Sequence, residues 1–139
     1  MGLQASIDIQ FAHELSPKEV VISLINNGWL LDFEDYVTFL MPTDIDDYDW
    51  QMKKRKDFIF EDFLSLHSHE DRVGVVLVNN DNIGGEFLIY SSWLSFSLSI
   101  NRVYLFPETK IVDFSLYLER LRSFTETVKI SSIQCELTY

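Results

Sequence analysis

The stretch VGVVLVNNDNIGGEFLIYSSWLSFSLSI, residues 73–100, decides the fold. Apolar side chains occupy every second position over 73–77, a turn-rich run of Asn, Asp and Gly follows at 79–85, and alternation resumes at 87–89. Two alternating runs around such a turn predict a β-hairpin. Residues 94–100 then alternate apolar side chains with serines, which predicts a further strand with one buried face and one face in water.

Upstream of this stretch, the sequence predicts a strand and a helix. Residues 5–12 have the composition of a strand. The run Ser16-Pro17-Lys18-Glu19 then predicts a helix start, because Pro17 suits the first helical position and Ser16 and Glu19 have the spacing of a capping box. Asn27-Gly28 predicts its end, since glycine adopts the left-handed conformation that terminates helices.

Two more elements are predicted between this helix and the hairpin. Residues 36–41 are nearly all apolar or β-branched, which is typical of a strand buried on both faces, and Pro42 ends it. Residues 50–66 are interpreted as a second helix. Its apolar side would consist of Phe58, Ile59, Phe63 and Leu66.

The C-terminal third predicts a helix and a last strand. The apolar phase changes near Asn101, which indicates a bulge or turn there, and Asp113 is a candidate N-cap for a third helix. Residues 128–137 form the last predicted strand, with a phase slip at 131–132. We therefore expect one α+β domain over residues 1–139, a mostly antiparallel sheet of about five to six strands with about three helices packed on it.

Composition limits the function. The 139 residues include 22 acidic and 11 basic side chains, a net charge of −11, which opposes direct binding of nucleic acid and favours a basic partner. The N-terminal residues resemble no secretory signal, no run approaches a membrane span, and the single cysteine forms no internal disulfide. We expect a cytoplasmic protein that binds no membrane, with Cys135 as an inert core thiol.

The acidic residues are concentrated in one stretch. No Lys or Arg lies between residues 19 and 52, whereas eight Asp and Glu residues do, interleaved with Trp and Tyr. Carboxylates around aromatic anchors favour a surface that binds a basic protein. The alternative is a solvated acidic rim whose aromatic side chains point into the core. The candidate partner-binding residues are Glu34, Asp44, Asp46, Asp47, Tyr48, Asp49 and Trp50.

Two other clusters have alternative interpretations. Lys53-Lys54-Arg55-Lys56 is the one basic run, which we interpret as a solvated turn or a counter-charge for nearby Asp residues rather than a phosphate site. His67 and His69, with Glu70 and Asp71 following, are candidate metal ligands or a general base. The sequence contains no nucleophile motif and no cofactor motif, so we predict no catalytic residue and no cofactor.

In size, charge, the acidic aromatic stretch 32–50 and the mixed order of helices and strands, the chain resembles the small acidic immunity proteins of bacterial toxin systems, including contact-dependent growth inhibition. This resemblance implies a cytoplasmic inhibitor that covers the active site of a basic toxin domain, such as a nuclease. It transfers no site residue, since the group has many folds.

Alternative functions remain at this point. One is a metal-dependent or acid-base enzyme that uses His67 and His69, and another is a phage-type DNA mimic or adaptor protein. An exposed sheet edge is an alternative interface to the acidic stretch, because an open edge accepts a partner strand. The sequence does not predict the oligomeric state.

Overall fold

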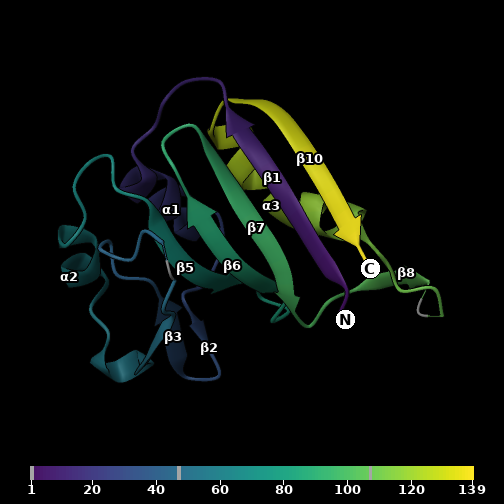
Figure 1. Ribbon diagram of the computed structural model, residues 1–139, viewed down its shortest axis with the longest axis horizontal. Helices are drawn as coiled ribbons and strands as arrows, with labels where there is room; N and C mark the ends of the chain where they lie inside the picture. Colours follow the sequence, from purple (N-terminus) through teal and green to yellow (C-terminus); the bar gives the residue numbers. More distant parts are fainter. Residues whose placement is uncertain (1, 47, 107) are drawn as a thin grey trace.

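An antiparallel sheet of eight strands forms the framework of the computed structural model (Figure 1), which describes residues 2–46, 48–106 and 108–139. The strand order is β10-β1-β7-β6-β5-β3-β2, and β4 also pairs with β3. These strands are β1 (Gln4–Phe11), β2 (Asp32–Phe33), β3 (Tyr36–Phe39), β4 (Gln51–Lys54), β5 (Val73–Val78), β6 (Gly84–Ile89), β7 (Trp93–Ile100) and β10 (Ile130–Thr138).

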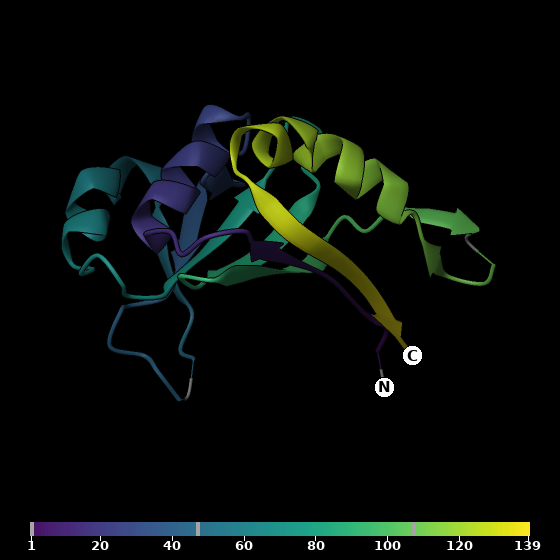
Figure 2. The same cartoon turned by 90° about the horizontal axis from the view of Figure 1, so that it is seen from above.

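A small hairpin and the helices complete the fold. The hairpin consists of β8 (Tyr104–Phe106) and β9 (Ile111–Val112), and it projects beyond the sheet next to the C-terminal end of β10 (Figures 1 and 2). The helices are α1 (Pro17–Asn26), the 3-10 turn η1 (Arg55–Asp57), α2 (Phe60–Ser65) and α3 (Phe114–Thr127). The predicted α+β class is confirmed, although the sheet has more strands than predicted.

The core lies between the sheet and the helices. Figure 2 shows α1 and α3 on one side of the strands, and the loop between β3 and β4 on the other side. Trp29 is buried here and makes edge-to-face contacts with Phe87 and Phe96, whose rings stack with centroids 4.1 Å apart. Burial of such large rings is a major contribution to stability. Among the described residues, no helix lies over the opposite face of β10, β1, β7 and β6 (Figure 2).

The prediction of one helix over residues 50–66 is wrong. Gln51–Lys54 instead form β4, which pairs with Tyr36–Phe39 of β3, and only Phe60–Ser65 are α-helical. Phe58 and Phe63 pack against Phe39 with ring centroids 5.4 Å from it, whereas Ile59 and Leu66 are exposed. Pairing with a distant strand therefore overrides the local helical spacing.

The strand buried on both faces is β5 rather than β3. In β3 exposed Tyr36 and half-buried Thr38 alternate with buried Val37 and Phe39, and the strand ends at Phe39. All six residues of β5 are buried. Because β5 lies inside the sheet between β3 and β6, both of its faces are covered by other parts of the chain.

The predicted start of α1 is confirmed, but its capping differs. Ser16 is the N-cap residue, and its side chain makes no capping hydrogen bond. The Ser16 hydroxyl instead donates to the carbonyl oxygen of His69 at 2.9 Å, which fastens the helix start to the loop before β5. The helix ends as predicted, with Gly28 at a φ of +99°.

Among the described residues, the eight-stranded sheet has register shifts at two positions. Between β6 and β7 the shift lies at Gly84 and Gly85, where a Cβ on Gly85 would lie 1.7 Å from the Ser97 carbonyl oxygen. Only glycine allows that approach. Both glycines lie in β6 rather than in the turn before it. In β10 the shift falls at Ser131, as predicted. Asp113 caps α3 by accepting from the Leu116 N–H at 3.3 Å.

Candidate protein-binding face

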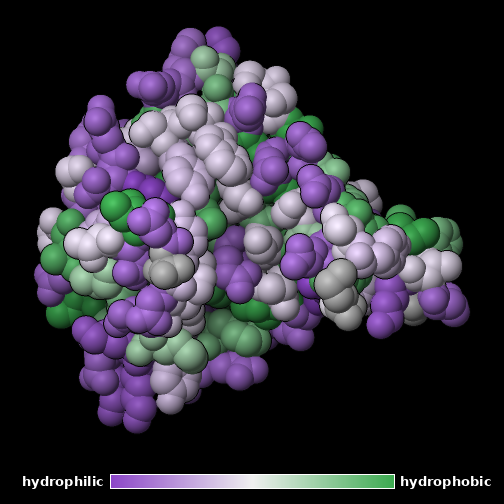
Figure 3. Space-filling model, viewed as in Figure 1, coloured by the Kyte–Doolittle hydropathy of each residue, from purple (hydrophilic) through white to green (hydrophobic). Residues whose placement is uncertain are grey.

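One face of the sheet carries polar side chains and faces away from the helices. We call it the open face. Because neighbouring residues of a strand point to opposite sides, buried Ile7 and Ile9 of β1 face the helices and Asp8 lies on the open face. The same alternation places Ser95 and Ser97 of β7 there. Figure 3 looks onto this face, where white and purple residues predominate over the strands.

The strand register aligns two carboxylates with two serines. Glu86 pairs with Ser97, Ser97 with Ser6, and Ser6 with Glu136, so these four residues form one row across β6, β7, β1 and β10. Three strand spacings separate the two ends of the row, roughly 14 Å. The Ser99 hydroxyl donates to Glu86 at 2.5 Å and helps to orient its carboxylate.

The next row adds a third carboxylate. Asp8 pairs with Ser95 on one side and with Gln134 on the other. The open face therefore carries Asp8, Glu86 and Glu136 around a strip of serine hydroxyls. Carboxylates and hydroxyls accept hydrogen bonds, so this surface is suited to donors such as Lys and Arg side chains.

A hollow of about 480 Å³ lies on this face. Serines of β1 and β7 line it together with Glu86 and Glu136, and Arg102 also lines it. Tyr48 and Trp50, from the loop between β3 and β4, complete the lining. The structure thus brings two of the predicted aromatic anchors to the carboxylates of the open face, although the loop is distant from these strands in sequence.

Arg72 and Tyr90 hold this loop in place. The Arg72 guanidinium donates to the carbonyl oxygens of Met41 and Asp44 and lies 4.9 Å from the centroid of the Tyr48 ring. The Tyr48 and Tyr90 hydroxyls are 3.2 Å apart. Burial, together with the hydrogen bond to Tyr48, raises the pKa of Tyr90 to about 12, so Tyr90 is uncharged at neutral pH. Tyr48 is therefore tied to the fold, and Trp50 is the freer of the two aromatic side chains.

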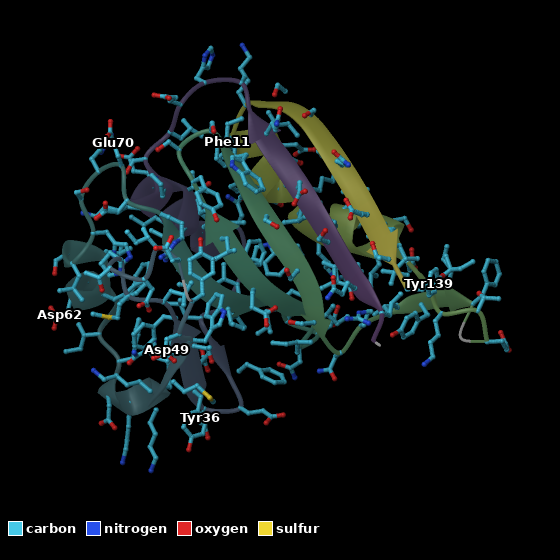
Figure 4. The ribbon with its side chains drawn as sticks, in the orientation of Figure 1. Phe11, Tyr36, Asp49, Asp62, Glu70 and Tyr139 are labelled. Carbon is cyan, nitrogen blue, oxygen red and sulfur yellow. The ribbon has the colours of Figure 1, made fainter. Side chains whose placement is uncertain are left out.

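The predicted acidic residues are not all brought together. Asp46 and Asp49 are exposed on the loop between β3 and β4, and Figure 4 shows where Asp49 lies. Asp44 is half-buried beside Arg72, and Asp47 lies outside the described residues. Glu34 lies in the turn between β2 and β3, where it lines a different hollow with Lys54 and Arg55. The structure thus separates Glu34 from the open face.

The two histidines do not form a joint site. The His67 ring is buried against Phe63, and its Nδ1 lies 3.0 Å from the Phe63 carbonyl oxygen, so Nδ1 is the donor. Desolvation lowers the pKa of His67, while His69 is exposed. Across residues 2–46, 48–106 and 108–139, no group of three or more His, Cys, Asp or Glu side chains is arranged to hold a metal ion.

The basic run lies on a sheet edge. Lys53 and Lys54 are exposed on β4, which pairs with β3 alone among the described strands, and lysines on such an edge oppose unwanted strand pairing. Arg55 lies 3.8 Å from Asp32, with both side chains about half exposed. The predicted counter-charge is thus present for one Asp, although an exposed pair of this kind stabilises little.

The prediction of a buried core thiol is wrong. Cys135 lies on β10 opposite Ile7, on the helix side of the sheet, and it is exposed. Although Cys135 lies on the side that faces the helices, β10 is the last strand of the sheet and the helices leave this part of it uncovered. Partial desolvation raises the pKa of the thiol.

Asp8, Glu86 and Glu136 are candidate binding residues that the sequence did not predict. The alternation of serines along residues 94–100 indicates a face in water. However, the alignment of these carboxylates depends on the pairing of β6, β7, β1 and β10, which alternation within single strands does not give.

Within the described part of the chain, no helix combines the length and the apolar character that crossing a membrane requires. Comparisons of the chain with protein-family models, with curated proteins and with solved structures found no match.

Proposed function

We propose that this protein is an inhibitor that binds one basic protein through the open face and the loop between β3 and β4. The observation that carries this proposal is the placement of three carboxylates, Asp8, Glu86 and Glu136, on an uncovered sheet face bordered by Tyr48 and Trp50. Basic side chains of the partner would occupy the hollow, and Trp50 would contact the surface around them.

Electrostatics supports this choice of partner. A net charge of −11 attracts a basic protein over long distances and accelerates its association. The loop adds Asp46 and Asp49, which are exposed beside the aromatic border of the open face. These two residues would steer the partner, whereas the carboxylates of the sheet would pair with its side chains after contact.

The resemblance to toxin-immunity proteins suggests the class of partner. A toxin domain that cuts nucleic acid needs a basic cleft for phosphates, and carboxylates on a rigid sheet can occupy such a cleft in their place. We therefore propose a cytoplasmic immunity protein whose target is a toxin domain of this kind, and which blocks the active site by covering it.

The test uses the tagged protein as bait in extracts of its own source, at low salt and then with washes of rising salt. We expect one basic protein to be retained near one to one, and one equivalent of the bait to suppress its nuclease activity. The double variant Glu86→Lys, Glu136→Lys should retain at least tenfold less of it, because lysines would face basic side chains.

A matched control distinguishes the loss of contacts at the open face from the effect of a changed net charge. Glu14→Lys with Glu70→Lys changes the net charge by the same amount at two exposed loop positions away from the hollow. This control should retain nearly as much partner as the wild type at moderate salt, where long-range steering is screened. Equal losses in both double variants would remove the open face from the interface.

A further inference from the structure

The strand β10 is an open edge of the sheet, and its one register shift, at Ser131, lies near its start. Among the described residues it pairs with β1 only, and its nine residues contain no Lys, Arg or Pro. The opposite end of the sheet differs, because β4 carries exposed lysines that discourage pairing. A long edge strand without lysines presents unpaired backbone groups to which another strand can pair.

The strand register shows which backbone groups of β10 are free to pair. The Phe11 N–H donates to the Ser92 carbonyl, so Gln10 and Trp93 are a non-hydrogen-bonded pair of β1 and β7. Every second residue of β1 from Gln10, including Asp8, therefore points its N–H and C=O toward β10. Gln134, the partner of Asp8, points back toward β1.

It follows that Ile133 and Cys135 point their backbone N–H and C=O groups away from β1, toward the open edge. Their side chains lie on the helix side and are not covered: Ile133 is 40% exposed and Cys135 is also exposed. At the same residues, the edge thus presents unpaired backbone groups and uncovered apolar side chains. A strand added here would cover both.

The charge distribution favours a second copy of this chain as that strand. Residues 102–139 contain five acidic and five basic side chains, so the whole net charge of −11 belongs to residues 1–101. The acidic stretch between residues 19 and 52 includes β2, β3 and the first half of β4, at the other end of the sheet. Two copies can therefore join their neutral ends and keep their acidic ends apart.

The projecting hairpin supplies further contacts at this end. Leu105, Phe106 and Ile111 are 53%, 55% and 37% exposed, and green residues mark the hairpin in Figure 3. Tyr139, labelled in Figure 4, donates to the Thr109 carbonyl at 3.5 Å and joins the hairpin to the end of β10. In an antiparallel pair, the second copy's β10 begins where the first one ends, so it begins beside this hairpin.

We propose that two copies of this chain pair their β10 strands antiparallel around Gln134, the middle residue of the strand. The dimer would have two-fold symmetry and one continuous sheet, and each hairpin would cover the start of the other copy's β10. In this register Ile133 lies opposite Cys135 of the second copy. Glu136 lies opposite Ser132 of the second copy, so no like charges meet.

The first test measures molecular mass by light scattering during gel filtration of the full chain. We expect twice 16.3 kDa at high protein concentration, with dissociation on dilution. Ile133→Lys should raise the dissociation constant at least tenfold, because it places a charge at the pairing edge. The control is Ile22→Lys on α1, where the side chain has a similar exposure of 38%, and it should leave the dimer unchanged.

The second test determines the register in which the two β10 strands pair. In a Cys135→Ser background, Gln134→Cys places two cysteines opposite each other in a non-hydrogen-bonded pair, where the Cα atoms are about 4.5 Å apart and a disulfide forms readily. Mild oxidation should therefore link the two copies. Ser132→Cys in the same background faces Glu136 of the second copy and should not crosslink.

Three outcomes would overturn the proposal: a monomer at every concentration, a dimer that Ile133→Lys does not weaken, or crosslinking at residue 132 in place of 134. If the edge instead takes a strand of the basic partner, the isolated chain stays monomeric and Ile133→Lys releases that partner. The mass measurement needs no partner, so its result is independent of the proposed inhibitor function.

Discussion

The buried imidazole of His67 links the stability of the fold to pH. Desolvation lowers its pKa, against the raising effect of the hydrogen bond to Phe63 and of Asp71. The unfolded chain therefore takes up this proton at a higher pH than the folded chain does. The contribution to stability is complete above the ordinary pKa of 6.5 and is lost as the pH falls through the lower pKa of the folded state.

We predict that His67→Phe flattens this dependence. The phenyl ring keeps the packing against Phe63 and cannot bind a proton. The drop in the free energy of unfolding between about pH 7 and pH 5, measured by urea denaturation, should be smaller than in the wild type. His69→Phe changes an exposed ring two residues away and should keep the wild-type drop; identical drops in all three proteins would refute the prediction.

Single residues also show where sequence analysis succeeds. The Asp113 cap and the Gly28 helix end were predicted correctly, because each depends on chemistry within a few residues. The roles of Ser16 and Cys135 were predicted wrongly, because their surroundings come from distant segments. The Ser16 hydroxyl donates to the carbonyl oxygen of His69, and the helices leave Cys135 uncovered. At the candidate site, Tyr48 and Trp50 were predicted from the acidic residues around them in the sequence, whereas Glu86 and Glu136, which line the same hollow, were not predicted.

At the scale of elements, the loop between β3 and β4 depends on one guanidinium. Arg72 reaches the carbonyl oxygens of Met41 and Asp44 and covers one side of the Tyr48 ring, and it comes from the residue just before β5. The loop is therefore fastened to a buried strand. This explains how a segment without a helix or strand of its own keeps a defined place beside the open face.

We predict that Arg72→Met loosens this loop and leaves the rest of the fold intact. Methionine fills part of the space and donates no hydrogen bond, so the free energy of unfolding should fall by about 1 kcal/mol. Hydrogen exchange at residues 43–46 should become at least tenfold faster, while β5 keeps its protection. Arg122→Met removes an exposed arginine of α3 and serves as the control; unchanged exchange in Arg72→Met would show that other contacts hold the loop.

The helices and strands also differ in how far their own residues determine which structure forms. The β5–β6 hairpin, β7 and α3 follow from local patterns, and the structure confirms them. The segment 50–66 contains helical spacing and still divides into β4, η1 and α2, because β3 offers Gln51–Lys54 a pairing partner. Local periodicity thus predicts the elements that their own residues determine. It does not predict an element, such as β4, that forms because a distant strand pairs with it.

At the scale of the whole molecule, the charge is distributed unevenly along the sheet. Repulsion among the acidic residues of the first 101 positions opposes folding, and salt screens that repulsion. We predict that the free energy of unfolding, measured with urea, rises as the salt concentration goes from about 0.01 M to about 0.15 M. The rise should disappear near pH 4.5, where the net charge is close to zero; equal rises at both pH values would contradict this explanation.

The position of β1 inside the sheet has a consequence for synthesis. This strand is made before both of its neighbours, because it pairs with β7 on one side and with β10 on the other. Gln4 is matched with Thr138, so every residue between these two must leave the ribosome before β1 has both neighbours. Until then, apolar residues of β1 stay without their final cover, and a nascent chain stalled before residue 130 would need a chaperone to avoid aggregation.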